Sequence, residues 1–288
     1  MKFIKKRMIW YIISLAIIIP GIISLFVNGL NLGIDFKGGS ILQLKFDKAV
    51  TAEQIRTVLD EFKLGTSSIQ ASNTSFIIRS KELSQVQEAK IFAEFESKFG
   101  KFTMERNEKV GPVIGKELTM NAIYALIVAS ILMIIYISFR FEWKFGVAAV
   151  LALLHDVFVV IGVFSILQIE VDSSFVAAVL TIIGYSINDT IVIFDRIREN
   201  LRINKKMPID ELIDNSVMQT LARSINTILA VIFVLVALLL VGGETTRIFS
   251  LALLVGVISG GYSSIFNASP IWYDLKRLIE GEKSVQRG

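Results

Sequence analysis

Two charged residues of opposite sign occur where the sequence is otherwise free of charge. Asp189 is the single charged residue of the apolar run 173–194, and Arg223 directly precedes the uncharged run 224–243. Placing a carboxylate in hydrocarbon costs roughly 2.5–3.5 kcal/mol, so an acid in such a run is a candidate functional group. An acid that is balanced by a nearby cation can change protonation when the cation moves. The pair could therefore work as a proton switch.

Helix geometry puts the two residues at similar depths. Asp189 stands five residues before Phe194, about 8 Å from one end of its run at 1.5 Å per residue. Arg223 opens the following run from the same side, and its long side chain can extend along that run. We therefore expect an ion pair between them. A purely structural pair, or an acid in a wet vestibule, is the alternative interpretation.

A second acid occurs deeper in the apolar sequence. Asp156 is the twelfth of the 25 residues of the run 145–169, next to His155, the single histidine of the chain. It could be a second proton site. It could equally be a hydrogen-bonding residue that contacts a neighbouring helix, with His155 as a packing residue.

Composition excludes most covalent and metal chemistry. The chain has no cysteine and one histidine, which excludes disulfides, thiolate metal sites, a cysteine nucleophile and multi-histidine metal sites. The segment 111–117 resembles a phosphate loop but has three spacers where four are needed, and an acid where Ser or Thr should hold magnesium. We expect no cofactor, no bound metal and no enzymatic activity. A hydrolase is the weakest alternative, because no nucleophile–base pair can be assembled.

The composition of the chain and its pattern of apolar residues predict a membrane protein. Of the 288 residues, 53% are hydrophobic and 19% are charged. About 20 apolar residues cross a bilayer as a helix. Six runs qualify: 8–27, 118–139, 145–169, 173–194, 224–243 and 248–273. The first follows a basic start, so a cleavable signal peptide is the alternative, but its length favours a retained anchor.

The distribution of lysine and arginine predicts the orientation. One set of segments is basic: Lys2, Lys5, Lys6, Arg7, Arg140, Lys144, Arg196, Arg198, Arg202, Lys205, Lys206, Arg223, Lys276, Arg277, Lys283 and Arg287. The short loops on the opposite side, 168–172 and 242–247, contain one basic residue between them, Arg247. Both termini should therefore be cytoplasmic, and no nucleic acid is needed to explain the net charge of +4.

The long loop 28–117 has the length of a domain and should lie outside. Alternation at 42–46 predicts a strand, and Thr51 with Gln54 predicts a capped helix. Ser72-Asn73 suggests a hairpin between Ile69 and 76–79. Ser80 precedes a predicted helix that carries Leu83 and continues to Phe99, and 102–110 reads as a last strand. The order βαββαβ is that of ferredoxin-like units.

The predicted fold is thus an all-α membrane bundle of six transmembrane helices with one extracytoplasmic α+β ferredoxin-like (βαββαβ) domain. Its parts are the cytoplasmic N-terminus and first helix (1–27), the outer domain (28–117), helices two to six (118–273) and a cytoplasmic tail (274–288).

Small residues form a stripe on each of two predicted helices. The sixth span carries Gly256, Ser259, Gly260, Ser263, Ser264 and Asn267 on one face, and the fourth carries Ala177, Thr181, Gly184, Tyr185 and Asn188. Small side chains let helices approach closely in lipid. We interpret Gly184, Asn188, Gly256 and Gly260 as helix-packing residues.

Several motifs together resemble one family. The stretch Gly184-Tyr185-Ser186-Ile187-Asn188-Asp189-Thr190, which continues through 194–200, is similar to the signature of the SecD/SecF family of bacterial protein-export membrane proteins. The stretches 33–39, 110–118, 154–157, 224–227 and 256–266 support the resemblance.

The resemblance implies a six-span subunit of the resistance-nodulation-division superfamily in the bacterial inner membrane, half of the usual twelve-span unit. It implies an obligate SecD partner, contact with the SecYEG channel, YajC and YidC as further partners, and an unfolded polypeptide as cargo. The family is thought to use the proton-motive force late in export. Asp189 resembles its essential intramembrane acid and Arg223 the basic neighbour. A small-molecule or lipid exporter of the superfamily and a passive scaffold are the rivals.

Overall fold

The computed structural model describes residues 2–72, 75–140 and 142–281. The chain forms two compact units: one holds the described residues up to Asn31 and from Tyr124 onward, and the other holds Leu32–Ile123. The predicted tail residues Lys283 and Arg287 and the hairpin residue Asn73 lie outside the described residues.

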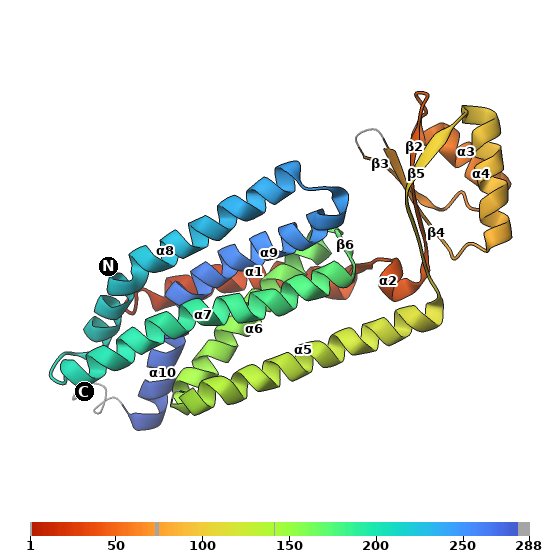
Figure 1. The fold of residues 1–288 in the computed structure, drawn as a ribbon. Coiled ribbons are helices and arrows are strands. Elements are labelled where there is room, and N and C mark those ends of the chain that lie inside the picture. The colour runs from red at the N-terminus through yellow and green to blue at the C-terminus, as the bar shows by residue number, and fades with distance from the viewer. Residues whose placement is uncertain (1, 73–74, 141, 282–288) are drawn as a thin grey trace. The chain divides into compact units, whose positions relative to one another are not determined.

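The first unit is built from long apolar helices, one of which, α5, begins in the second unit; among the described residues, six helical segments are long and apolar enough to cross a membrane. This confirms the six predicted spans. The helices, shown in Figure 1, are α1 (Arg7–Val27), α5 (Pro112–Arg140), α6 (Trp143–Leu167), α7 (Ser173–Ile203), α8 (Ile209–Val241) and α9 (Glu244–Ser263), which continues through the π-helix η1 (Ser264–Ala268) into α10 (Ser269–Glu280). Two short strands, β1 (Asn31–Leu32) and β6 (Glu170–Val171), follow α1 and α6 in the chain.

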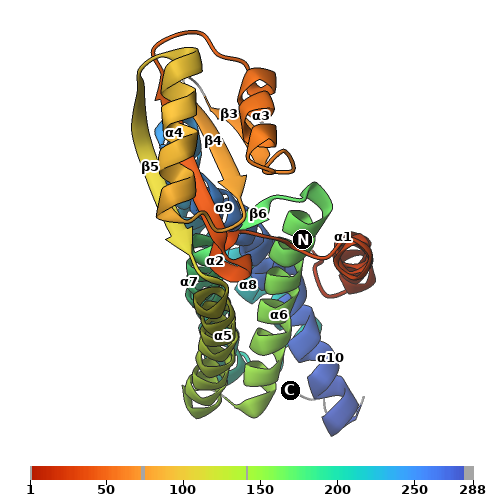
Figure 2. The same cartoon turned by 90° about the vertical axis from the view of Figure 1, so that its right-hand side faces the viewer.

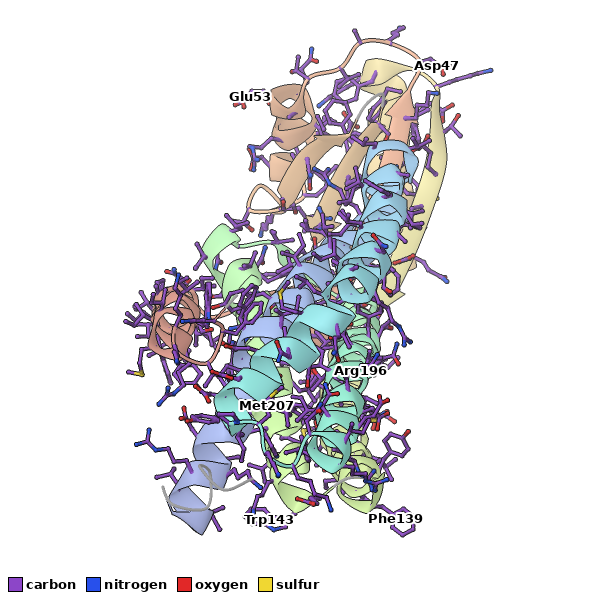
Figure 3. The ribbon with its side chains drawn as sticks, turned by 90° about the vertical axis from the view of Figure 1, so that its left-hand side faces the viewer. Asp47, Glu53, Phe139, Trp143, Arg196 and Met207 are labelled. Atoms are coloured by element: carbon purple, nitrogen blue, oxygen red, sulfur yellow. The ribbon has the colours of Figure 1, made fainter. Side chains whose placement is uncertain are left out.

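Helices α7 and α8 are longer than the apolar segments that predicted them. Helix α7 continues to Ile203 and α8 begins at Ile209, so polar turns extend both beyond the predicted spans. Arg196 and Met207, labelled in Figure 3, belong to these extensions and the connection between them. Backbone hydrogen bonds continue wherever the residues favour a helix, so the end of an apolar run does not end the helix.

Helix α9 is at the centre of the bundle. It packs against α6, α7 and α8, and α1 packs against α6. The contact of α1 with α6 is very close: a Cβ on Gly21 would lie 2.8 Å from the Cα of Gly162. The buried apolar core includes Phe145, Phe194 and Trp272, with the rings of Phe145 and Trp272 stacked 4.5 Å apart.

The second unit is a four-stranded antiparallel sheet with two helices on one of its faces (Figure 2). Along the chain it comprises α2 (Ile34–Lys37), β2 (Gly39–Phe46), α3 (Ala52–Glu61), β3 (Ser68–Ser72), β4 (Ser75–Ser80), α4 (Gln85–Phe99) and β5 (Phe102–Val110). The strands lie in the order β3-β4-β2-β5. Inward-facing Leu42 and Leu44 pack with Ile55 of α3 and Phe95 of α4.

Of the two helix starts predicted in this unit, one is confirmed and one is corrected. The capping box of Thr51 and Gln54 begins α3 as predicted. The second helix begins later than predicted: Ser84, not Ser80, is its N-cap and forms a capping box with Gln87, so Leu83 precedes the helix. Ser80 is the last residue of β4, and a serine within a strand cannot cap a helix.

The turn into β2 requires glycine. Gly39 has a φ of 142°, and a Cβ there would lie 2.5 Å from the carbonyl oxygen of Ser80. The preceding Gly38 has a φ of 76° and ends the short helix α2, which the sequence pattern did not predict. Glycine adopts such backbone angles without steric cost.

Candidate functional site

Asp189 lies on α7 where this helix packs against α8. Its Oδ1 accepts a hydrogen bond of 2.7 Å from the hydroxyl of Ser224 on α8. Its Oδ2 is buried and has no hydrogen-bond partner among the described residues. One turn away, the Tyr185 hydroxyl donates to the carbonyl oxygen of Thr227, 3.3 Å away, so polar contacts recur along this seam. A half-buried carboxylate with one oxygen unpartnered can accept a proton without first breaking a hydrogen bond.

The predicted ion pair between Asp189 and Arg223 is not formed. No nitrogen of Arg223 lies within 4.0 Å of the carboxylate in the described structure, and the side chain is exposed. Consecutive residues of a helix point about 100° apart, so Ser224, which is fully buried, occupies the direction that faces α7.

Asp156 is fully buried and lies in a shell of hydrogen-bond donors. Its Oδ1 accepts from the Ser259 hydroxyl at 2.7 Å and is 3.0 Å from Nδ1 of His155. Its Oδ2 accepts from Ser186 at 2.6 Å and from Ser263 at 2.7 Å. Three of these four contacts join helices: the carboxylate connects α6 to α7 through Ser186 and to α9 through Ser259 and Ser263. We call Asp156, Ser186, Ser259 and Ser263 the serine cage.

The backbone of α9 makes room for the serine cage. A Cβ on Gly260 would lie 3.1 Å from Cβ of Ser186 on α7 and 3.5 Å from Oδ2 of Asp156 on α6. A side chain at this position would therefore push α9 away from α7. The π-helix η1 begins directly after Ser263 and turns Ser264 inward, where its hydroxyl is 2.8 Å from that of Thr190. Single turns of π-helix are frequent at functional sites.

The four predicted packing residues divide into two pairs. Gly256 and Gly260 face neighbouring helices, and a Cβ on Gly256 would lie 2.2 Å from Cδ1 of Ile182. Gly184 and Asn188 instead lie on an exposed face of α7, where a Cβ on Gly184 would meet nothing within 4 Å. No other helix of the described chain covers Gly184 and Asn188, whereas Tyr185 of the same stripe contacts α8, so their role in helix packing stays a prediction.

The sequence interpretation missed the roles of four hydroxyls. Ser186, Ser259 and Ser263 were assigned to packing or to a motif, and Ser224 was assigned to a motif only. A signal did exist for two of them: Ser259 and Ser263 are four residues apart on one face of an uncharged run. A buried acid elsewhere in the bundle needs such donors, because a buried polar group without hydrogen bonds is costly.

Comparison with known proteins places this arrangement in a family. Residues 90–278 match the model of the protein export membrane protein SecD/SecF, C-terminal, and residues 23–50 match the SecD/SecF GG motif. A protein translocase subunit SecF from Sebaldella termitidis is 42% identical over 295 residues, which cover 100% of this chain and 96% of that protein. The SecF from Acidaminococcus fermentans is 44% identical over 286 residues, which cover 96% of this chain and 98% of that protein.

Longer relatives contain a similar sequence as one part. A protein translocase subunit SecDF from Bacillus subtilis is 42% identical over 275 residues, which are 94% of this chain and 37% of that protein. The crystal structure of SecDF from Thermus thermophilus, a translocon-associated membrane protein, is similar with a TM-score of 0.89 and 37% identity. The match covers 96% of this chain and 39% of that one. This chain therefore spans about two fifths of the SecDF chains it matches.

Proposed function

The chain belongs to the SecD/SecF family of protein export membrane proteins, and we propose that it is a SecF-type translocase subunit that uses the proton-motive force. In this proposal a proton that enters from outside neutralises Asp189. The hydrogen bond from Ser224 and the attraction of Arg223 then weaken, and α7 shifts against α8. That movement reaches the unit Leu32–Ile123, which acts on the exported polypeptide.

The contrast between the two buried acids carries this proposal. Asp156 accepts hydrogen bonds from three serine hydroxyls and also contacts Nδ1 of His155, whereas Asp189 has one hydrogen bond and one unpartnered oxygen among the described residues. The oxygens of Asp156 are all in use, so a proton could bind there only if a contact were displaced. Asp189 is therefore the better proton acceptor, at a helix seam where a loss of charge changes the contact.

The energy available is of the right size. One elementary charge that crosses 100 mV releases roughly 2.3 kcal/mol. A bias of that size changes the ratio of two conformations about fifty-fold, since about 1.4 kcal/mol is a factor of ten. Losing one charge-assisted hydrogen bond involves about 1.5–3 kcal/mol, which is comparable.

The partner in this proposal is SecD, because relatives of the SecDF type join a matching segment to a longer chain. We place it on the face of α7 and α8 that carries Gly184, Asn188 and Asn226, all exposed. Exposed amides are unfavourable against lipid, so a second protein surface is the better neighbour. SecYEG, YajC, YidC and the unfolded polypeptide complete the proposed assembly.

Orientation and the outer domain are part of the same proposal. The chain lies in the bacterial inner membrane with both termini in the cytoplasm. The unit Leu32–Ile123 is a domain on the extracytoplasmic side. We propose that this unit is ferredoxin-like, which its strand order β3-β4-β2-β5 and its two helices support. No enzymatic step and no cofactor are assigned to the chain.

Asp189→Asn tests the proposal in proteoliposomes that contain this chain, SecD and the translocation channel. The amide keeps the shape of the side chain, so we expect normal folding and complex formation but no stimulation of export by an imposed proton gradient. Asp189→Glu, which restores the titratable group, should recover part of the stimulation. Normal stimulation with the amide would support a passive scaffold, and transport of a dye or lipid in place of a precursor would support the exporter.

A further inference from the structure

Of the two ring nitrogens of His155, one has a hydrogen-bond partner among the described residues and the other has none. The ring is buried on α6, and its Nδ1 is 3.0 Å from Oδ1 of Asp156. Its Nε2 is also buried and has no hydrogen-bond partner among the described residues. A buried ring nitrogen without a partner is uncommon and requires an explanation.

The serine cage determines which nitrogen carries the hydrogen. Three serine hydroxyls donate to Asp156, and the hydroxyl of Ser259 has this carboxylate as its one recorded partner. Together with Nδ1 of His155 they fill the four acceptor positions of an ionised carboxylate. With Asp156 ionised, Nδ1 donates its hydrogen to the carboxylate, and the lone pair of the neutral ring then lies on Nε2.

The charge balance also favours a proton at this position. No lysine or arginine in the described ranges lies within 4.0 Å of Asp156, and the one ion-pair partner recorded for it is His155. An ionised Asp156 beside a neutral His155 would therefore leave one negative charge without a cation in contact in the middle of a predicted span. A proton on Nε2 would make the buried pair neutral overall, which lowers the cost of burial.

The surroundings suit an imidazolium. The ring of Tyr262 on α9 is stacked on His155 with centroids 5.9 Å apart, a distance at which an aromatic face attracts a cation. The titratable groups recorded in contact with His155 are Asp156 on its own helix and Tyr262. Helix α1 contributes two neutral groups: the backbone carbonyl oxygen of Trp10 accepts from the Tyr262 hydroxyl, and the Ser14 hydroxyl donates to it.

A buried acceptor exists in the same polar layer. Asn267 in η1 donates its amide to the Ser14 hydroxyl at 2.8 Å, while its Oδ1 is buried and unpartnered among the described residues. Ser14 in turn bonds with Tyr262, the residue that stacks on His155. The layer between α1, α6 and α9 therefore holds both an open proton acceptor and an open hydrogen-bond acceptor.

We propose that Nε2 of His155 is a second proton-binding site, with Asp156 as its fixed counter-ion, separate from Asp189. Hydronium supplies the proton: one of its O–H bonds breaks, an N–H bond forms at the Nε2 lone pair, water remains, and no bond within the protein breaks. The role of this proton in export depends on the proposed function, but its binding does not. The residue that titrates in the α6 site is therefore His155, and Asp156 positions it.

The single histidine makes the test direct. The full chain is produced with ¹⁵N-histidine and without a histidine tag, and is placed in lipid nanodiscs, so that one imidazole gives the nitrogen NMR spectrum. We expect the neutral ring to carry its hydrogen on Nδ1 and the ring to become doubly protonated as the pH falls. A neutral ring with hydrogen on Nε2, or one that does not titrate between about pH 5 and 9, would overturn the proposal.

Three variants keep the result interpretable. Asp156→Asn removes the counter-ion, and the titration midpoint should fall by about one pH unit or more. Ser259→Ala keeps the charge but removes one donor, so the histidine should still titrate, with an unchanged or higher midpoint; this variant serves if Asp156→Asn does not fold. Asp189→Asn should leave the midpoint unchanged. An unchanged midpoint in folded Asp156→Asn, or a lower one in Ser259→Ala, would contradict the assignment.

Discussion

The Ser224 hydroxyl lies 2.7 Å from Oδ1 of Asp189 and is the one hydrogen-bond donor recorded for this carboxylate. The contact joins α8 to α7 inside the predicted spans, and Ser224 is fully buried. The hydrogen bond to the carboxylate of Asp189 thus comes from a neutral hydroxyl and not from Arg223. A proton on Asp189 would change the contact between two helices directly.

The first prediction concerns this hydroxyl. Ser224→Ala removes the donor that stabilises the ionised form of Asp189, so protonation occurs at lower proton concentration. Hydrogen bonds to charged groups contribute about 1.5–3 kcal/mol, which corresponds to about one to two pH units. We expect the pH profile of gradient-driven export to move to higher pH by that amount, as measured in proteoliposomes.

Ser224→Thr is the matched control, because it keeps the hydroxyl and should keep the profile near that of the parent protein. A profile that does not move in Ser224→Ala would mean that Asp189 is not the group that titrates during export. The thermal midpoint of each variant, measured in detergent, separates a changed switch from a changed fold.

The position of Ser224 also shows where prediction from the sequence ended. The apolar runs and the lysine and arginine pattern were enough to predict six spans, because lipid demands length and apolarity. They were not enough to decide which of two consecutive residues, Arg223 or Ser224, faces Asp189. That choice depends on the rotation of α8 about its axis, which packing against α7 and α9 determines.

The serine cage was hidden for a related reason. Small side chains at helical spacing indicate close packing in lipid whether or not their hydroxyls donate to something. Ser259 and Ser263 do both, and the sequence alone does not show that Asp156 lies opposite them. The same pattern on α7 faces outward, so Gly184 and Gly256 looked equivalent until their surroundings were known.

The second prediction compares two buried serines on α9. Ser259→Ala removes a donor to the buried carboxylate of Asp156 and should lower the free energy of unfolding by about 1–3 kcal/mol. Ser250 is also buried, but its hydroxyl has no partner among the described residues. Ser250→Ala should therefore change stability by less than about 0.5 kcal/mol, or increase it. Equal losses in the two variants, measured by unfolding in detergent, would show that the cage bonds are not stabilising.

The third prediction compares two glycines. Gly256→Val places methyl groups where Ile182 already lies, 2.2 Å from the position of a Cβ, and should destabilise the bundle by about 1–3 kcal/mol. Gly184→Val adds the same atoms to an exposed face of α7 with nothing within 4 Å. The isolated chain should tolerate it, and thermal unfolding of both variants is the measurement. A loss in Gly184→Val as large as that in Gly256→Val would mean that α7 is rotated relative to the structure.

The fourth prediction uses the absence of cysteine from the chain. A single cysteine at Gly184 can carry a benzophenone probe on the exposed face of α7, which also presents the amide of Asn188. Ile12 on α1 is exposed as well, at 62%, but its neighbourhood is apolar and suits lipid. We expect irradiation of membranes to join Gly184→Cys to SecD, and Ile12→Cys to lipid. An adduct with SecD from Ile12→Cys and none from Gly184→Cys would place the partner on α1. Asn188 would then need a different neighbour, because an amide facing hydrocarbon is unfavourable.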